Sequence, residues 1–110
     1  MTVAELINKD IFKVLVEGEE TSADISKVFC CDLLSIAMSR ASAGCAWVTV
    51  MGNINTLAVA TLTDAACIIL AEGIDLDDAA LLKAKEEGIT VLQTELPVFE
   101  AALAVHELLV

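Results

Sequence analysis

The chain has 110 residues, 57% hydrophobic and only 4% aromatic, so residues 1–110 are expected to form one domain with an aliphatic core. Seventeen acidic and six basic residues give a formal net charge of −11, and Arg40 is the single arginine. Such a chain cannot neutralise a row of phosphates, which excludes nucleic-acid binding and disfavours binding to an anionic membrane surface.

The first part of the chain is expected to contain one helix and two short strands. Thr2 can cap a helix over the first turns, with Glu5 in the capping-box position. Apolar residues then predict strands at 12–16 and 25–31, which are separated by a polar turn and loop.

Beyond residue 31, helices alternate with strands that carry no charge. The strands expected here are at 46–51, 67–71 and 89–93. The helices run from Asp32 or the next residue to near Gly44, from the 52–55 turn to near Ala65, and from about Leu76 to Glu87, and a last helix begins at Pro97. Asp75 is expected to cap the third of these helices and Gly88 to close it. Strands without polar residues on either face must be covered by helices on both faces. The sequence therefore predicts a three-layer α/β/α domain with a mainly parallel central sheet, in which 46–51, 67–71 and 89–93 are mutually parallel.

The location of the protein is predicted from its first residues and its cysteines. The N-terminus lacks the apolar core of a signal peptide, and the longest apolar stretch, 65–71, is too short to cross a bilayer. Apolar runs contain all four cysteines, as expected for reduced thiols: Cys30, Cys31, Cys45 and Cys67. We therefore expect a cytoplasmic protein.

The reactive side chains form no metal-binding or catalytic pattern. Adjacent Cys30 and Cys31 point to opposite faces of a strand, and no Cys-x-x-Cys pair occurs, so no metal site is expected. Buried inert thiols are the simpler interpretation, with redox sensing by Cys31 or Cys45 as the alternative.

The single histidine and the acidic run near residue 76 also have structural explanations. His106 shares a helix face with Phe99, Ala102 and Leu103, and no nucleophile or acid is placed to make it a catalytic base. Asp75, Asp77 and Asp78 are carboxylates at a helix N-terminus, where they stabilise the helix dipole. We expect no catalytic residue, no metal and no cofactor.

One candidate ligand site lies where the parallel strands end, because ligands of open α/β sheets bind beyond the carboxyl ends of the strands. The residues placed there are Asp32, Gly52, Asn53, Asn55, Glu72, Gly73, Thr94 and Glu95. Glycine turns, amides and carboxylates suit a small polar or cationic ligand, but not a bare phosphate, since no Lys or Arg is expected nearby. The alternative is that Asn53 or Asn55 simply caps the following helix.

Several segments in the second half of the chain follow a known layout. They are WVTVMG at 47–52, CIILAEG at 67–73, KEEGITVLQT at 85–94 and the Pro-x-Phe-Glu start of the last helix at 97–100. This layout resembles the DRTGG domain, which occurs between other modules in some phosphotransacetylases and is akin to the N-terminal domain of HPr kinase/phosphorylases. Residues 1–32 also match its helix–strand–loop–strand beginning.

The motif that gives the family its name is altered here. Gly52-Asn53-Ile54 stands where the family usually has Gly-Asp-Arg, and Ala71-Glu72-Gly73 stands where it has Thr-Gly-Gly. Only Gly52 and Gly73 carry over, as turn residues. The resemblance implies a regulatory or interaction module, since the kinase chemistry of HPr kinases lies in a separate domain with a phosphate-binding loop that this chain lacks.

The hydrophobic surplus of so small a chain predicts self-association. The candidate surface is the last helix, where apolar residues span more than one face: Phe99, Leu103, Val105, Leu108, Leu109 and Val110, with His106 near the rim. The leading hypothesis is a regulatory or interaction module without catalytic activity, acting as a homodimer with a protein partner. The alternative is a sensor that binds a nucleotide or another small molecule at the carboxyl ends of the strands.

Overall fold

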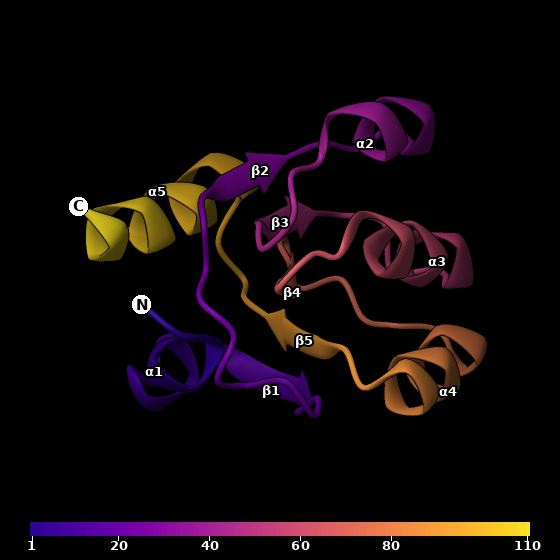
Figure 1. Cartoon of the computed structure of the whole chain (residues 1–110), viewed down its shortest axis with the longest axis horizontal. Helices are drawn as coiled ribbons and strands as arrows, with labels where there is room; N and C mark the ends of the chain where they lie inside the picture. The colour runs from indigo at the N-terminus through magenta and orange to yellow at the C-terminus, as the bar shows by residue number, and fades with distance from the viewer.

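Helices and strands alternate along the chain from residue 28 onward in the computed structural model, which describes residues 1–110 (Figure 1). The elements in chain order are α1 (Val3–Asn8), β1 (Lys13–Val16), β2 (Val28–Cys30), α2 (Leu34–Arg40), β3 (Ala46–Thr49), α3 (Ile54–Thr63), β4 (Cys67–Leu70), α4 (Asp78–Glu87), β5 (Thr90–Gln93) and α5 (Val98–Leu109). No helix is long and apolar enough to cross a membrane.

The strands form one five-stranded sheet in the order β1-β5-β4-β3-β2. β2, β3, β4 and β5 are parallel, with Ala46 opposite Cys67 and Cys67 opposite Thr90. β1 forms one edge and runs antiparallel to β5. The prediction of three mutually parallel central strands is therefore confirmed.

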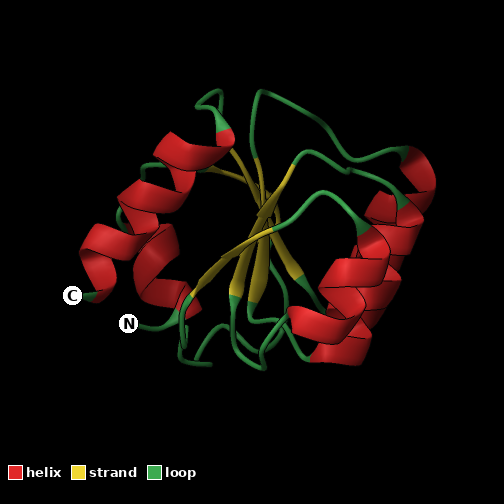
Figure 2. Cartoon of the chain, turned by 90° about the horizontal axis from the view of Figure 1, so that it is seen from above, coloured by secondary structure: helices red, strands yellow, loops and turns green.

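Helices cover both faces of this sheet. α2, α3 and α4 lie on one side, and α1 and α5 lie on the other (Figure 2). Successive residues of a strand point to opposite faces, so Trp47 packs in the core beneath α2–α4, whereas Val48 packs in the core beneath α1 and α5. This is the predicted three-layer α/β/α domain, and the lack of charge on β3 and β4 follows from their burial between two helical layers.

Two predicted caps are present in the structure. Thr2 Oγ1 accepts a hydrogen bond from the Glu5 backbone N–H, and a Glu5 carboxylate oxygen accepts one from the Thr2 N–H, each over 3.1 Å. The hydrogen bond from the Thr2 N–H, and then that from the Thr2 side chain, lower the pKa of the Glu5 carboxyl group. At the end of α4, Gly88 has a left-handed φ of 67°, as a helix-closing glycine requires.

Several predicted boundaries are wrong: α2 ends at Arg40 rather than near Gly44, and β3 ends at Thr49 rather than at residue 51. β2 covers only 28–30 of the expected 25–31, because the Ile25 N–H donates to the carbonyl of Met1 and the Ser26 N–H donates to that of Gly44. Pro97 is the N-cap of α5 rather than its first helical residue.

Another wrong boundary is the start of α4. Asp77, not Asp75, caps this helix, and its side chain accepts a hydrogen bond from the Ala80 N–H over 2.8 Å. The expected helix from about Leu76 therefore begins two residues later, at Asp78.

Candidate functional site

The carboxyl ends of the four parallel strands meet at one edge of the sheet, and the structure places the predicted site residues there. Asp32 follows β2, Gly52 and Asn53 follow β3, Glu72 and Gly73 follow β4, and Thr94 follows β5. The loops that contain them are joined by hydrogen bonds, so this edge is a connected network rather than a set of separate turns.

Asp32 connects the end of β2 to the end of β3. Its Oδ1 accepts a hydrogen bond of 2.7 Å from the Thr49 hydroxyl and one of 2.9 Å from the Val50 N–H. The Thr49 hydroxyl in turn accepts from the Met51 N–H over 3.2 Å. Thr49 is fully buried, so the Asp32 carboxylate satisfies a hydroxyl that would otherwise be buried without a partner.

Asn53 is the N-cap of α3, which agrees with the capping alternative. Its side-chain oxygen accepts from the N–H groups of Asn55 and Thr56, over 3.0 and 3.2 Å. Asn55 lies in the first turn of the helix and is exposed. The carbonyl of Gly52 accepts from the Asp77 N–H over 3.1 Å, and a Cβ at Gly52 would overlap the carbonyl oxygen of Asp75. Glycine is therefore required for the close approach of two loops.

The turn after β4 bonds to the turn after β5. Glu72 and Gly73 both have left-handed φ values, 58° and 69°. Their N–H groups donate to the carbonyls of Leu96 and Thr94, each over 2.9 Å, and the Thr94 hydroxyl accepts from the Leu96 N–H over 3.2 Å. Glu95 also contributes here, because its carboxylate lies where a side chain on Gly73 would point.

Gln93 is a site residue that the sequence did not reveal. It is buried at the end of β5, and its Nε2 donates to the carbonyl of Ile74 over 2.9 Å and to the Asp75 carboxylate over 2.7 Å. It thus fixes the loop before α4. The apolar pattern of β5 gave no signal for this role, because a single amide in a buried strand is recognised only from its partners.

Lys13 corrects the expectation that this edge lacks a basic residue. β1 runs antiparallel to β5 and places Lys13 directly opposite Gln93. Directly opposite residues in a sheet lie on the same face, so the exposed Lys13 shares the face of Gln93. The sequence does not give the direction of β1, so it could not show that Lys13 lies near the carboxyl ends of the parallel strands.

The cysteines do not assemble into a metal site. No group of three or more His, Cys, Asp or Glu side chains could hold a metal ion. Cys45 and Cys67 are fully buried, and burial raises the pKa of both thiols, that of Cys67 to about 12. Cys30 is exposed, and partial burial together with the Asp32 carboxylate raises its pKa. The half-buried Cys31 donates its S–H to the Leu33 carbonyl over 3.3 Å.

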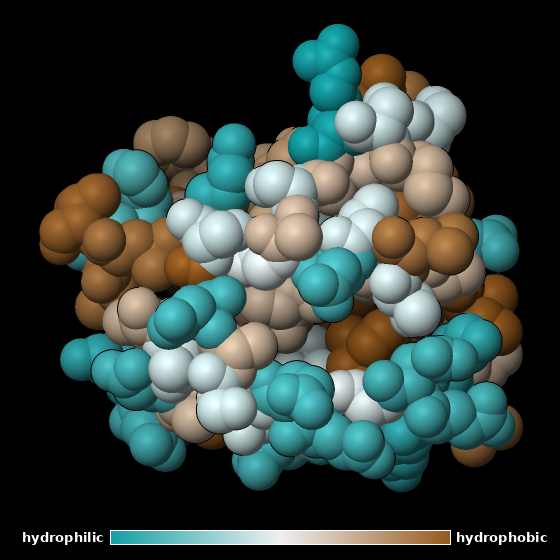
Figure 3. All heavy atoms as spheres, in the orientation of Figure 1, coloured by the Kyte–Doolittle hydropathy of each residue, from teal (hydrophilic) through white to brown (hydrophobic).

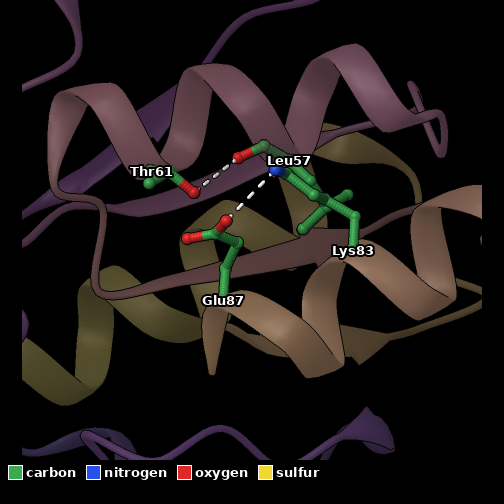
Figure 4. Close-up of polar contacts among 4 residues, drawn as sticks. All are labelled: Leu57, Thr61, Lys83 and Glu87. Carbon is green, nitrogen blue, oxygen red and sulfur yellow. Dashed lines mark hydrogen bonds and ion pairs between the residues drawn. The ribbon is translucent and has the colours of Figure 1, made fainter.

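A cavity of about 200 Å³ lies at the opposite edge of the sheet, where α3 and α4 end. Its acidic side chains are Glu20, Asp64 and Glu87. Figure 4 shows α3 and α4 side by side near this cavity, with Glu87 3.1 Å from Lys83 in an ion pair along α4. The Thr61 hydroxyl, which donates to the Leu57 carbonyl over 3.0 Å, lies nearby on α3. Lys83 therefore compensates one of the three carboxylates.

No protein-family model matches this chain, and no curated protein matches it. One similar solved structure comprises the CBS and DRTGG domains of the regulatory region of Clostridium perfringens pyrophosphatase, complexed with its activator diadenosine tetraphosphate. The TM-score is 0.74 at 16% sequence identity, and the match covers 93% of this chain. It covers 44% of the pyrophosphatase chain, so this chain spans less than half of that regulatory region. The likeness shows a shared fold.

Proposed function

We propose that the chain is a DRTGG-like regulatory or interaction module without catalytic activity of its own, which acts as a homodimer and binds a protein partner. The observation that carries this proposal is that the polar side chains at the carboxyl ends of the parallel strands, here called the carboxyl edge, have structural roles. Asp32, Asn53 and Gln93 all hold one loop to another or cap a helix. Covalent catalysis at such an edge would need a nucleophile and a base within hydrogen-bond reach of each other.

One thiol and the single histidine lie on the α5 side of the sheet. Cys30 and His106 both line a groove between β2 and α5. The raised pKa of Cys30 keeps it a neutral thiol near pH 7, which is a poor nucleophile. The fold shared with part of a pyrophosphatase regulatory region supports the same proposal.

The test measures catalytic turnover by the purified chain. Purified chain is incubated with ATP and Mg²⁺, and phosphate release and phosphoryl transfer are followed. We expect rates equal to those of a heat-denatured control. Turnover that persists through purification and disappears in a folded Asp32→Asn variant would contradict the proposal. Asparagine keeps an oxygen that can accept from Thr49 and Val50, so this variant removes the charge without removing the bonds.

The second candidate function is a nucleotide sensor, and the position of Lys13 beside Gln93 is the observation that favours it. Lys13 at the carboxyl edge supplies a cation for a phosphate group, although the carboxylates of Asp75 and Glu95 would repel that phosphate. Thermal unfolding with diadenosine tetraphosphate or ATP, with and without Mg²⁺, separates the two functions. The leading proposal predicts no shift in Tm. Stabilisation by about 2.7 kcal/mol at a hundredfold excess over Kd, lost in Lys13→Gln, would establish the sensor instead.

A further inference from the structure

The last helix, α5, presents two apolar faces, of which only one is covered by the sheet. Ala101 and Val105 are fully buried against the sheet. Val105, one of the apolar residues expected to span more than one face of this helix, therefore belongs to the covered face. Phe99 and Leu103 point away from the core and are 69% and 40% exposed. They share this outer face with Ala102 and His106, since residues three, four and seven apart lie on one side of a helix.

The outer face of α5 borders an apolar groove of about 250 Å³. Its lining residues are Val28, Cys30, Phe99, Ala102, Leu103 and His106. The other wall is β2, which is the outermost strand of the sheet and pairs with β3 alone. Figure 1 shows β2 between α2 and α5, and in Figure 3 hydrophobic surface gathers over the C-terminal half of α5 at the left of the view. We call the groove lined by these residues (Val28, Cys30, Phe99, Ala102, Leu103 and His106) the β2–α5 groove.

The charge of the chain indicates what can occupy this groove. The chain has a net charge of −11, yet the β2–α5 groove contains no carboxylate. Glu100 and Glu107 belong to α5 but do not line the groove. Two acidic copies of the chain can therefore meet here without bringing carboxylates face to face, whereas like charges would oppose contact across most other surfaces. A basic partner, by contrast, would gain no ion pair inside the groove.

We propose that α5 of a second copy packs antiparallel in the β2–α5 groove, with Phe99 against His106 of the partner subunit. This inference rests on the proposed homodimer and specifies its interface. In a two-fold symmetric contact the same surface is used twice. If Phe99 faces the partner's His106, the axis passes between Ala102 and Leu103. Each Leu103 side chain then meets the small Ala102 of the partner subunit, which leaves room for close helix packing.

The first test uses charge insertion with a matched control. Phe99→Glu places a carboxylate in the contact, and Leu62→Glu places one on α3, where Leu62 is 71% exposed and lies outside the groove. Both positions are exposed, so both variants are expected to fold. We expect Phe99→Glu to weaken the dimer about tenfold or more, as for the loss of an aromatic anchor, and Leu62→Glu to leave it unchanged in sedimentation equilibrium.

The second test measures the register by disulfide trapping in a Cys30→Ser, Cys31→Ser background. The two Leu103 positions lie close to the axis, so Leu103→Cys is expected to form a covalent dimer on mild oxidation. Val110→Cys is not, because the two Val110 positions would be about 22 Å apart along the helices at about 1.5 Å per residue. Efficient trapping at Val110 instead of Leu103 would overturn the antiparallel register.

The outcomes separate this inference from the proposed function. A wild-type dimer that tolerates Phe99→Glu and is not trapped at Leu103 overturns the interface but leaves the homodimer intact. A wild-type chain that is monomeric at every concentration overturns both. A groove that binds another protein while the chain stays monomeric also overturns the proposal.

Discussion

Replacing Asn53 by alanine distinguishes a helix cap from a ligand contact. The change removes the oxygen that accepts hydrogen bonds from the N–H groups of Asn55 and Thr56. The Thr56 N–H also donates to the Asn53 carbonyl over 3.1 Å, so it keeps a partner, and the main loss falls on Asn55. We therefore expect a loss of about 1 kcal/mol in the free energy of unfolding, near the middle of the range for such caps.

Trp47 provides the assay. It is the single tryptophan, is fully buried, and donates its indole N–H to the Cys31 carbonyl over 3.0 Å, so its fluorescence reports loss of the core. Urea unfolding of Asn53→Ala should show a lower midpoint with an unchanged slope, and Tm should fall by about 4 °C. Asn53→Ser keeps a capping oxygen and should unfold within a few tenths of a kcal/mol of the wild type, roughly as cap preferences rank.

Equal stability of the wild type and Asn53→Ala would refute the capping role. A variant that keeps its stability but loses the Tm shift produced by a nucleotide would assign Asn53 to ligand binding instead.

Three further predictions concern the same loops and the buried thiol. Gly52→Ala should cost about 2 kcal/mol in urea unfolding, because the added methyl group overlaps the carbonyl of Asp75 and forces two loops apart. Glu72→Gly should raise the free energy of unfolding, by up to about 1 kcal/mol, since glycine adopts the φ of 58° without steric cost; a loss of stability would contradict this. The fully buried Cys67 thiol, with its pKa raised to about 12, should react with a thiol reagent at pH 8 only after unfolding. In the unfolded chain the Cys67 thiol ionises at its ordinary pKa of 9.0, whereas in the folded chain it stays neutral until about pH 12. The contribution of the neutral thiol to the free energy of unfolding is therefore complete below about pH 9 and is lost as the pH rises towards 12. A Cys67→Ala control should lack this fall in stability.

The layers of the fold could be predicted because burial leaves a direct trace in the sequence. β3 and β4 have no charged residue, and strands of that kind require cover on both faces. The caps formed by Thr2 and Gly88 were also predictable, since each depends on residues within one turn of a helix.

What could not be predicted depends on contacts between distant segments. The sequence places several carboxylates before α4, and only the bond from Gln93 to Asp75 shows why Asp77 is the one that caps the helix. Lys13 reaches the carboxyl edge because β1 is antiparallel, and no local pattern encodes strand direction.

The most direct test of a homodimeric interaction module is the molar mass of the chain in solution, measured by light scattering at low and at high salt. We expect a mass of twice the 11.6 kDa chain. The dimer should be kept or strengthened in high salt, because salt screens the repulsion between copies of charge −11 and leaves an apolar contact intact. A mass of 11.6 kDa under all conditions, or a dimer that dissociates as salt is added, would contradict it.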